Sequence, residues 1–188
     1  VLDRAYEAAK GKGKVGTTGK GIGPTYSDKA ARIGLRVGDI LDGFEEKYRA
    51  LKARHEQILK DLGFTDYDIT DDERRWMEGV DYMRGFRLSD TEHEINALLR
   101  EGKNVLAEGA QGSLLDIDHG TYPFVSSSST TCGGVCTGLG VAPRMIGEVF
   151  GIFKAYSTRV GSGPFPVELF DETGDTIRHI GNEYGAVT

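Results

Sequence analysis

The amino-acid sequence predicts an α/β fold with parallel strands and an attached helical subdomain. Two apolar runs, NVLAEG (104–109) and FGIFKAYSTRVGSG (150–163), each end in glycine and are typical of buried strands. Residues 141–149 between them are rich in helix formers, so the order strand, loop, helix, strand indicates a parallel crossover. A third stretch, residues 39–101, has the three- and four-residue apolar spacing of amphipathic helices.

Residues 1–38 are predicted to form a phosphate-binding glycine loop between two helices. The first helix covers residues 1–9, where apolar residues recur at helical spacing. The glycine-rich loop that follows leads into a short helix expected to begin near Ser27 or Asp28, because either side chain can cap it. A glycine loop that enters a helix is a common anion-binding arrangement.

The GTTGKG segment of this loop resembles a Walker A motif but does not satisfy it. Lys14 occupies the position of the first glycine, and Gly21 occupies that of the final serine or threonine. Backbone amides, the hydroxyls of Thr17 and Thr18, and Lys20 can nevertheless hold a phosphate. An ordinary flexible turn is the alternative interpretation.

Arg32, on the second short helix, is a further candidate for anion binding. A guanidinium can form a two-pronged hydrogen bond with a phosphate or a carboxylate. Most arginines in such positions are surface or ion-pair residues, so this alternative also stays open.

Residues 39–103 are predicted to form the helical subdomain. An amphipathic helix is expected over residues 39–60. Two further helices are expected to start at capping boxes, the first formed by Thr70 with Glu73 and the second by Thr91 with Glu94.

Residues 104–188 are predicted to form an α/β core segment that carries site loops. Ligands in parallel α/β folds bind at the carboxyl ends of strands, which here are GAQGSLLDIDHG and STRVGSGPFP. Gln111 can donate and accept hydrogen bonds at the edge of a purine, or bond the backbone of a tight turn. Asp116, Asp118 and His119 can bind a cation or move protons. The alternative is that Asp118 and His119 hydrogen-bond each other and nearby amides and so fix the loop. A short helix is expected over DETGDTIRHIG.

Composition narrows the partners. The 23 Lys and Arg against 29 Asp and Glu give a net charge of −6, which disfavours a broad nucleic-acid surface. No apolar run approaches the ~20 residues that cross a bilayer, and the first residues do not read as a secretion signal. The expectation is a cytoplasmic protein without nucleic-acid or membrane partners.

Four segments together resemble the adenylosuccinate synthetase family in order and approximate spacing. They are VGTTGKGIGPTYSDKAARIGLRVGD, EGAQGSLLDIDHGTYPFVSSSSTT, KAYSTRVGSGPFPVELFDETG and GNEYGAVT. The resemblance implies a mostly parallel sheet related to P-loop NTPases. It implies a homodimer that ligates IMP and L-aspartate into adenylosuccinate in AMP biosynthesis, with GTP as co-substrate and Mg²⁺ as cofactor. The implied route passes through 6-phosphoryl-IMP.

The resemblance also implies roles for individual residues. Gln111 falls beside the reacting edge of the purine and is the catalytic candidate in this chain. The other positions that match substrate-binding residues are Thr18 and Ser126 (IMP phosphate), Arg32 (the same phosphate, from the neighbouring subunit), Val160 (ribose), and Val187 and Thr188 (start of the aspartate loop). Ser126 stands where many relatives carry threonine.

By the same resemblance, the catalytic acid and base and the Mg²⁺ ligands lie upstream of Val1, with no metal ligand in this chain. The fragment alone is therefore expected to be inactive. The alternative hypothesis is a truncated, non-catalytic module that binds IMP.

Overall fold

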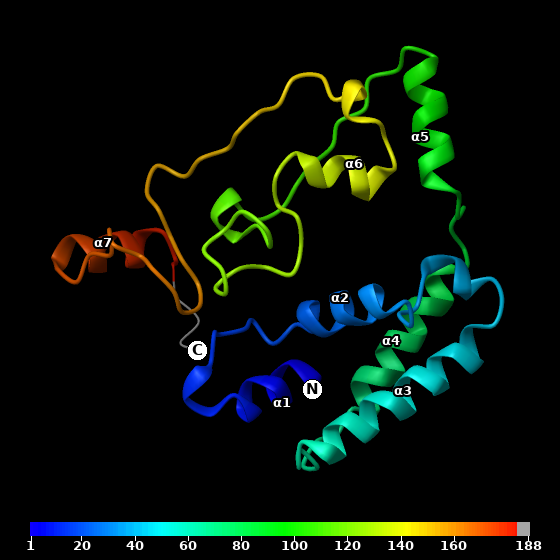
Figure 1. The fold of residues 1–188 in the computed structure, drawn as a ribbon, viewed down its shortest axis with the longest axis horizontal. Helices are drawn as coiled ribbons and strands as arrows, with labels where there is room; N and C mark the ends of the chain where they lie inside the picture. The colour runs from blue at the N-terminus through cyan, green and yellow to red at the C-terminus, as the bar shows by residue number, and fades with distance from the viewer. Residues whose placement is uncertain (184–188) are drawn as a thin grey trace.

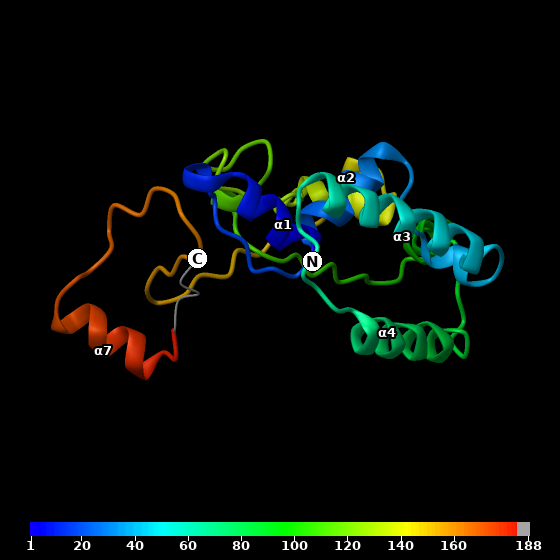
Figure 2. The ribbon, with the colours of Figure 1, turned by 90° about the horizontal axis from the view of Figure 1, so that it is seen from below.

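Seven α-helices joined by long irregular segments make up the described part of the computed structural model, residues 1–183 (Figure 1). The helices are α1 (Leu2–Ala9), α2 (Ile22–Ala31), α3 (Phe44–Asp61), α4 (Thr70–Met83), α5 (Thr91–Arg100), α6 (Gly133–Leu139) and α7 (Glu172–Ile180). Short 3₁₀ turns occupy Gly11–Gly13, Val37–Ile40, Ser113–Leu115 and Pro143–Met145. Two views show α7 at the opposite end of the molecule from α3 and α4 (Figures 1 and 2).

The predicted α/β fold with a parallel sheet is wrong for the described residues, which contain no strand. Residues 104–109 and 150–160 are irregular instead, and most of their apolar side chains face solvent. Leu106 is 90% exposed, Ile152 97% and Phe153 92%. A strand forms only when a neighbouring strand accepts its backbone hydrogen bonds, and neither segment has such a neighbour here. Apolar composition alone cannot reveal whether that neighbour exists.

The predicted crossover helix over residues 141–149 is also absent. Only the 3₁₀ turn Pro143–Met145 forms there, followed by irregular chain. A short helix that was not predicted, α6, lies instead just before this region. It ends at Gly140, whose left-handed φ of 67° is a common helix terminus.

The helical predictions in the rest of the chain are largely confirmed. Helices α1 and α7 form as expected, and Asp171 caps α7 by accepting a hydrogen bond from the Gly174 N–H at 3.0 Å. Helix α2 begins at Ile22, earlier than predicted, because Pro24 is tolerated in a first turn, where N–H groups lack intrahelical acceptors. Helices α3, α4 and α5 all fall within residues 39–103, whose boundaries as a subdomain stay a prediction.

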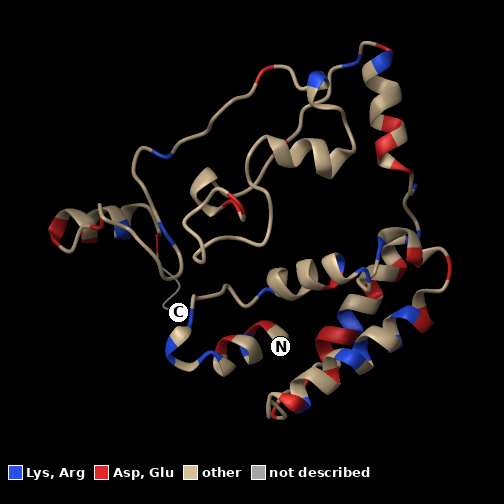
Figure 3. Cartoon of the chain, viewed as in Figure 1, with Lys and Arg blue, Asp and Glu red and all other residues tan. Residues whose placement is uncertain are grey.

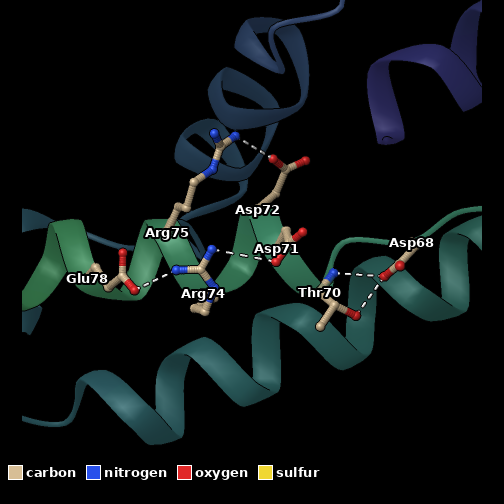
Figure 4. A network of polar contacts seen from close by, with 7 residues as sticks. All are labelled: Asp68, Thr70, Asp71, Asp72, Arg74, Arg75 and Glu78. Carbon is tan, nitrogen blue, oxygen red and sulfur yellow. Dashed lines mark hydrogen bonds and ion pairs between the residues drawn. The ribbon is translucent and has the colours of Figure 1, made fainter.

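Neither predicted capping box forms. At the start of α4, Asp68 accepts hydrogen bonds from the N–H and hydroxyl of Thr70 at 2.8 and 2.6 Å (Figure 4). Glu73 instead accepts hydrogen bonds from Tyr48 and Lys52, which fasten α4 to α3. At α5 the residue preceding the helix is Asp90, so Thr91 lies inside the first turn. At α4, therefore, hydrogen bonds to another helix occupy Glu73, the residue that the predicted capping box requires.

Two small apolar clusters hold the helices together. Leu2 and Ala5 of α1 pack against Leu59 of α3. Phe44 of α3 and Val80 of α4 form the second cluster with Ile40, and Trp76 lies over Phe44 with ring centres 5.6 Å apart. Exposed ion pairs line the outer face of α4, where Arg74 pairs with Glu78 at 2.7 Å (Figure 4). Such exposed pairs contribute little stability.

Charge is distributed unevenly along the chain. Lys, Arg, Asp and Glu are dense on α3 and α4, whereas the irregular segment after α5 is nearly free of them (Figure 3). Residues 104–143 contain no Lys or Arg at all. Within residues 1–183, no helix combines the length and apolar composition needed to cross a membrane.

Candidate functional site

The glycine loop, residues 14–21, is held in place by two carboxylates of α1. Asp3 and Glu7 are four residues apart, so they project from the same face of the helix. Glu7 accepts a hydrogen bond from the Gly16 N–H at 3.0 Å, and Asp3 accepts one from the Gly21 N–H at 2.6 Å. Burial opposes ionisation of Glu7, but hydrogen bonds from Lys10 and Gly16 outweigh it and lower its pKa.

These contacts correct the expectation that the loop's glycine amides are free to hold an anion. The N–H groups of Gly16 and Gly21 are taken by α1, and that of Gly19 donates to the Thr17 hydroxyl at 3.1 Å. Thr18 is exposed, and its hydroxyl has no hydrogen-bond partner in the part of the chain that the structure describes. These three glycine N–H groups are therefore not free to bind a ligand, and Thr18 carries an exposed hydroxyl in this loop.

The second part of the site is the loop of residues 112–131, built around Asp116. This carboxylate is only 1% exposed. Its Oδ1 accepts hydrogen bonds from the N–H groups of Asp118 and His119 at 3.0 and 3.1 Å, and its Oδ2 accepts one from the Thr130 N–H at 2.8 Å. Burial disfavours the charged form, but these backbone donors outweigh burial and lower the Asp116 pKa to about 2.

Backbone pairing sets the serine run beside the first half of the same loop. The Ser126 N–H donates to the Leu115 carbonyl at 2.8 Å, and the Ile117 N–H donates to the Ser128 carbonyl at 3.2 Å. The hydroxyls of Ser126 and Ser128 lie 3.2 Å apart. These backbone hydrogen bonds fix the position of the half-buried Ser126 residue within the loop.

Residues 159–163 join these two loops. The Ser162 N–H donates to the Val15 carbonyl at 3.2 Å, which ties the segment to the glycine loop. The Arg159 guanidinium donates to the Phe124 carbonyl at 3.1 Å and to the Ser162 carbonyl at 2.8 Å. The segments that carry Thr18, Ser126 and Val160 therefore meet, although they lie far apart in sequence (Figure 1).

Helix α2 adds its first turn to this meeting point. A Cβ atom added to Gly23 would lie 3.6 Å from the Ser127 hydroxyl, so the start of α2 lies close to the serine run. The helix is ten residues long and carries a partial positive charge at this end.

Arg32 lies at the opposite end of α2 from the three loops. The helix is about 15 Å long at 1.5 Å per residue, so Arg32 is far from Thr18 in the same chain. Arg32 has a left-handed φ of 63°, is exposed, and makes no side-chain hydrogen bond or ion pair within residues 1–183. Nearby, His55 of α3 lies 2.8 Å from the Asp28 carboxylate and fixes this end of α2.

Gln111 stands at the entrance of the 112–131 loop. Its φ of 69° is left-handed, which is uncommon for a residue with a side chain and occurs often at functional sites. The side chain is exposed and makes no hydrogen bond to Ser126 or Thr18. Val160 is also exposed, whereas Val187 and Thr188 lie outside the described residues.

Comparison with known proteins identifies the family of this chain. The family model described as adenylosuccinate synthetase matches residues 1–188. This chain belongs to the adenylosuccinate synthetase family. The resemblance found in the sequence motifs is thereby confirmed.

Individual synthetases match over the whole chain. The adenylosuccinate synthetases of Bacteroides thetaiotaomicron and Parabacteroides distasonis are 67% and 68% identical over 188 residues, which cover 44% of each relative. The solved structure of a fully ligated synthetase from Plasmodium falciparum is 40% identical with a TM-score of 0.85. That match covers 98% of this chain and 43% of the other. The chain thus spans less than half the length of these synthetases.

The described residues of this chain do not fit a Mg²⁺ site. No group of three or more His, Cys, Asp or Glu side chains gathers within residues 1–183. Both oxygens of Asp116, the most enclosed carboxylate of the site, already accept backbone hydrogen bonds. Asp116 therefore fixes the loop, a role that the sequence interpretation considered only for Asp118 and His119.

Three residues of the site escaped sequence reasoning: Asp3, Glu7 and Arg159. Each acts on backbone groups 9 to 35 positions away in the chain. For Asp3 and Glu7 a signal existed, since carboxylates four residues apart on a helix directly precede a glycine loop. For Arg159 no sequence pattern pointed to Phe124.

Proposed function

We propose that this chain supplies the IMP-binding part of a GTP-dependent ligase that joins IMP and L-aspartate into adenylosuccinate. The supporting observation is that three loops, carrying Thr18, Ser126 and Val160, are tied together by hydrogen bonds. A nucleotide site needs groups for phosphate, sugar and base at fixed separations, and these loops supply candidates for each. The reaction belongs to AMP biosynthesis, for which the cytoplasm is the proposed compartment.

The hydroxyls of Thr18 and Ser126 are the proposed ligands of the IMP 5′-phosphate. The N-terminal end of α2 faces the same region and favours negative charge. The loop that carries Ser126 offers no cation of its own, because residues 104–143 lack Lys and Arg. Lys20, beside Thr18, can supply one positive charge.

The second charge is proposed to come from the partner subunit's Arg32. Within one chain, Arg32 lies a helix length away from Thr18, beyond the reach of an arginine side chain. A symmetric homodimer solves this problem, because each protomer then completes the other's site. The exposure of Arg32, and its lack of an ion-pair partner among residues 1–183, leave its guanidinium available.

The remaining roles follow the purine ring and the sugar. Gln111 is proposed to hydrogen-bond the reacting edge of the base, since its amide both donates and accepts. Val160 is proposed to contact the ribose. Val187 and Thr188, outside the described residues, are the proposed start of the aspartate loop.

The proposed reaction depends mainly on holding the reacting groups in the right positions. A purine oxygen is a poor leaving group until it carries a phosphoryl group, so GTP is proposed to phosphorylate the 6-oxygen of IMP. The aspartate amine then displaces phosphate from the 6-phosphoryl-IMP. Loops fixed by internal hydrogen bonds hold IMP in one geometry through both steps, which lowers the entropic part of each barrier. The Mg²⁺ cofactor has no proposed ligand among residues 1–183.

The test uses a chimaeric synthetase, in which this chain replaces the matching 188 residues of the Bacteroides thetaiotaomicron protein. Purified chimaera is incubated with IMP, GTP and L-aspartate, and adenylosuccinate is measured by chromatography, with each substrate omitted in turn. We expect product only when all three are present. A folded chimaera that makes none, beside an active parent, would overturn the proposal.

The isolated 188-residue chain shows whether these residues bind IMP without the rest of the protein. Calorimetric titration with IMP is compared with the same ligation assay. Weak IMP binding without product is expected of the isolated chain under either hypothesis, so the chimaera decides between them.

A further inference from the structure

We propose that Asp116 is a positioning residue for IMP, which sets the Ser126 hydroxyl by holding the two halves of the 112–131 loop together. This inference rests on the proposed IMP site. It assigns Asp116 no contact with substrate, so Asp116 acts only through the backbone that carries other side chains.

The two oxygens of Asp116 serve different halves of the loop. Oδ1 accepts from the N–H groups of Asp118 and His119, which continue directly from Asp116. Oδ2 accepts from the N–H groups of Thr130 and Thr131, at 2.8 and 3.4 Å, on the returning half. The Asp116 side chain therefore bridges both halves of the loop. On the returning half it binds Thr130, which is four residues after Ser126.

Other contacts make this bridge necessary. Backbone hydrogen bonds pair the halves at Thr121 with Leu114, at Ser126 with Leu115 and at Ser128 with Ile117, but none of these reaches Thr130. Past that point, the Thr130 hydroxyl donates to the Gly112 carbonyl at 2.8 Å, so Thr130 and Asp116 together close the end of the loop nearest Gln111. The opposite turn is tight, since a Cβ atom on Gly120 would lie 2.5 Å from the carbonyl oxygens of Asp116 and Leu114.

An aspartate suits this position better than its amide counterpart. All the backbone groups that reach Asp116 are donors, and a carboxylate accepts on both oxygens. An asparagine presents one oxygen and one NH₂ group, so whichever way it turns, one half of the loop loses its acceptor. Asp116→Asn therefore releases one half of the loop while keeping side-chain size.

The experiment measures Asp116→Asn in the chimaeric synthetase. We expect the KM for IMP to rise by about ten- to a hundredfold, because small displacements of substrate-binding groups have effects of that size. The KM for GTP should change by less than about twofold. Asp68→Asn is the matched control, since Asp68 also accepts a backbone N–H but lies at the start of α4. It should leave both constants unchanged.

A double-mutant cycle with Ser126→Ala shows whether Asp116 acts through Ser126. If it does, Ser126→Ala costs much less in IMP affinity when Asp116→Asn is already present. Additive effects, or equal rises in KM for all three substrates, would overturn the proposal. An unmodified chimaera that makes no adenylosuccinate would instead indicate failure of the proposed function.

Thr130→Val provides a second variant if Asp116→Asn does not fold. It removes the hydrogen bond to Gly112 while leaving the buried carboxylate in place. A smaller rise in the KM for IMP, with an unchanged KM for GTP, is expected. An unchanged KM for IMP would contradict the bridging role of this end of the loop.

Discussion

The Asp3 carboxylate accepts a hydrogen bond from the Gly21 N–H at 2.6 Å, and this contact joins α1 to the residue immediately before α2. An aspartate from another helix thus accepts the N-cap N–H, which in a capping box bonds to a glutamate of the helix itself. The loop between them carries Thr18. Stability and IMP binding are therefore linked at this contact.

Asp3→Ala should lower the free energy of unfolding of the chimaera by about 1 kcal/mol, the usual net contribution of one hydrogen bond. It should also raise the KM for IMP, because the start of α2 is released. Denaturant unfolding and steady-state kinetics measure the two effects. Asp71→Ala, at an exposed ion pair of α4, is the control and should change stability by less than about 0.5 kcal/mol. Equal losses in both variants would show that the contact is unimportant.

Arg159→Lys should raise the KM for IMP about as much as Arg159→Ala, by roughly tenfold, or about 1.4 kcal/mol. The planar fork of Arg159 reaches the Phe124 and Ser162 carbonyls at once, and an ammonium group does not reproduce this geometry. Kinetics of both variants in the chimaera give the comparison. Wild-type behaviour of the lysine variant would mean that charge, rather than the link between loops, is what IMP requires.

Gly163→Ala should destabilise the protein by about 1–3 kcal/mol, the usual range for backbone strain. Gly163 has a φ of 118°, and an added Cβ atom would lie 2.7 Å from the Phe124 side chain. Gly147→Ala is the matched control, because nothing lies within 4 Å of its added Cβ atom. Thermal unfolding of the two variants should therefore differ clearly. Similar melting temperatures would contradict the tight packing of residues 159–163.

The Asp116 pKa predicts how acid affects stability. Its pKa is about 2 in the folded chain against 3.8 ordinarily, so the folded state favours the ionised form. The ionised Asp116 carboxylate stabilises the folded state fully above about pH 4, and this stabilisation is lost as the pH falls towards about 2. Asp116→Asn should be less stable than wild type at neutral pH, and the difference should shrink on acidification. A difference that stays constant between pH 6 and about pH 3 would contradict this assignment.

Mixed dimers test the role of Arg32. Arg32→Ala and Thr18→Ala chimaeras should each be nearly inactive, but a mixture that has exchanged subunits should regain about one quarter of wild-type activity. Half of the dimers are then mixed, and each mixed dimer has one intact site. Activity is assayed after refolding the two variants together. If the mixture is no more active than its components, Arg32 does not act across an interface.

Sequence reasoning succeeded where local pattern decides structure and failed where a distant partner does. Apolar spacing located α1 and α3, and α7 forms within the segment DETGDTIRHIG, where a short helix was expected. The capping box at Thr70 did not form because Glu73 is bonded to Tyr48 and Lys52 of another helix. The predicted strands failed for the same reason, since strand formation depends on a pairing neighbour.

The candidate site shows the same division. Motifs identified the segments of Thr18, Ser126 and Val160, but not the contacts that join them. Those contacts link Asp3 to Gly21, Val15 to Ser162 and Phe124 to Arg159. Each connects residues that are 18 or more positions apart, and no local pattern encodes such a pairing.

The most direct test of the proposed IMP site compares the affinities of IMP and inosine, which differ only in the 5′-phosphate. Calorimetric titrations of the chimaeric synthetase with each ligand should show strong preference for IMP. In Thr18→Ala and in Ser126→Ala the ratio of IMP affinity to inosine affinity should fall, while the affinity for inosine stays the same. An unchanged ratio of IMP to inosine affinity in both variants would contradict the claim that the phosphate binds where the three loops meet.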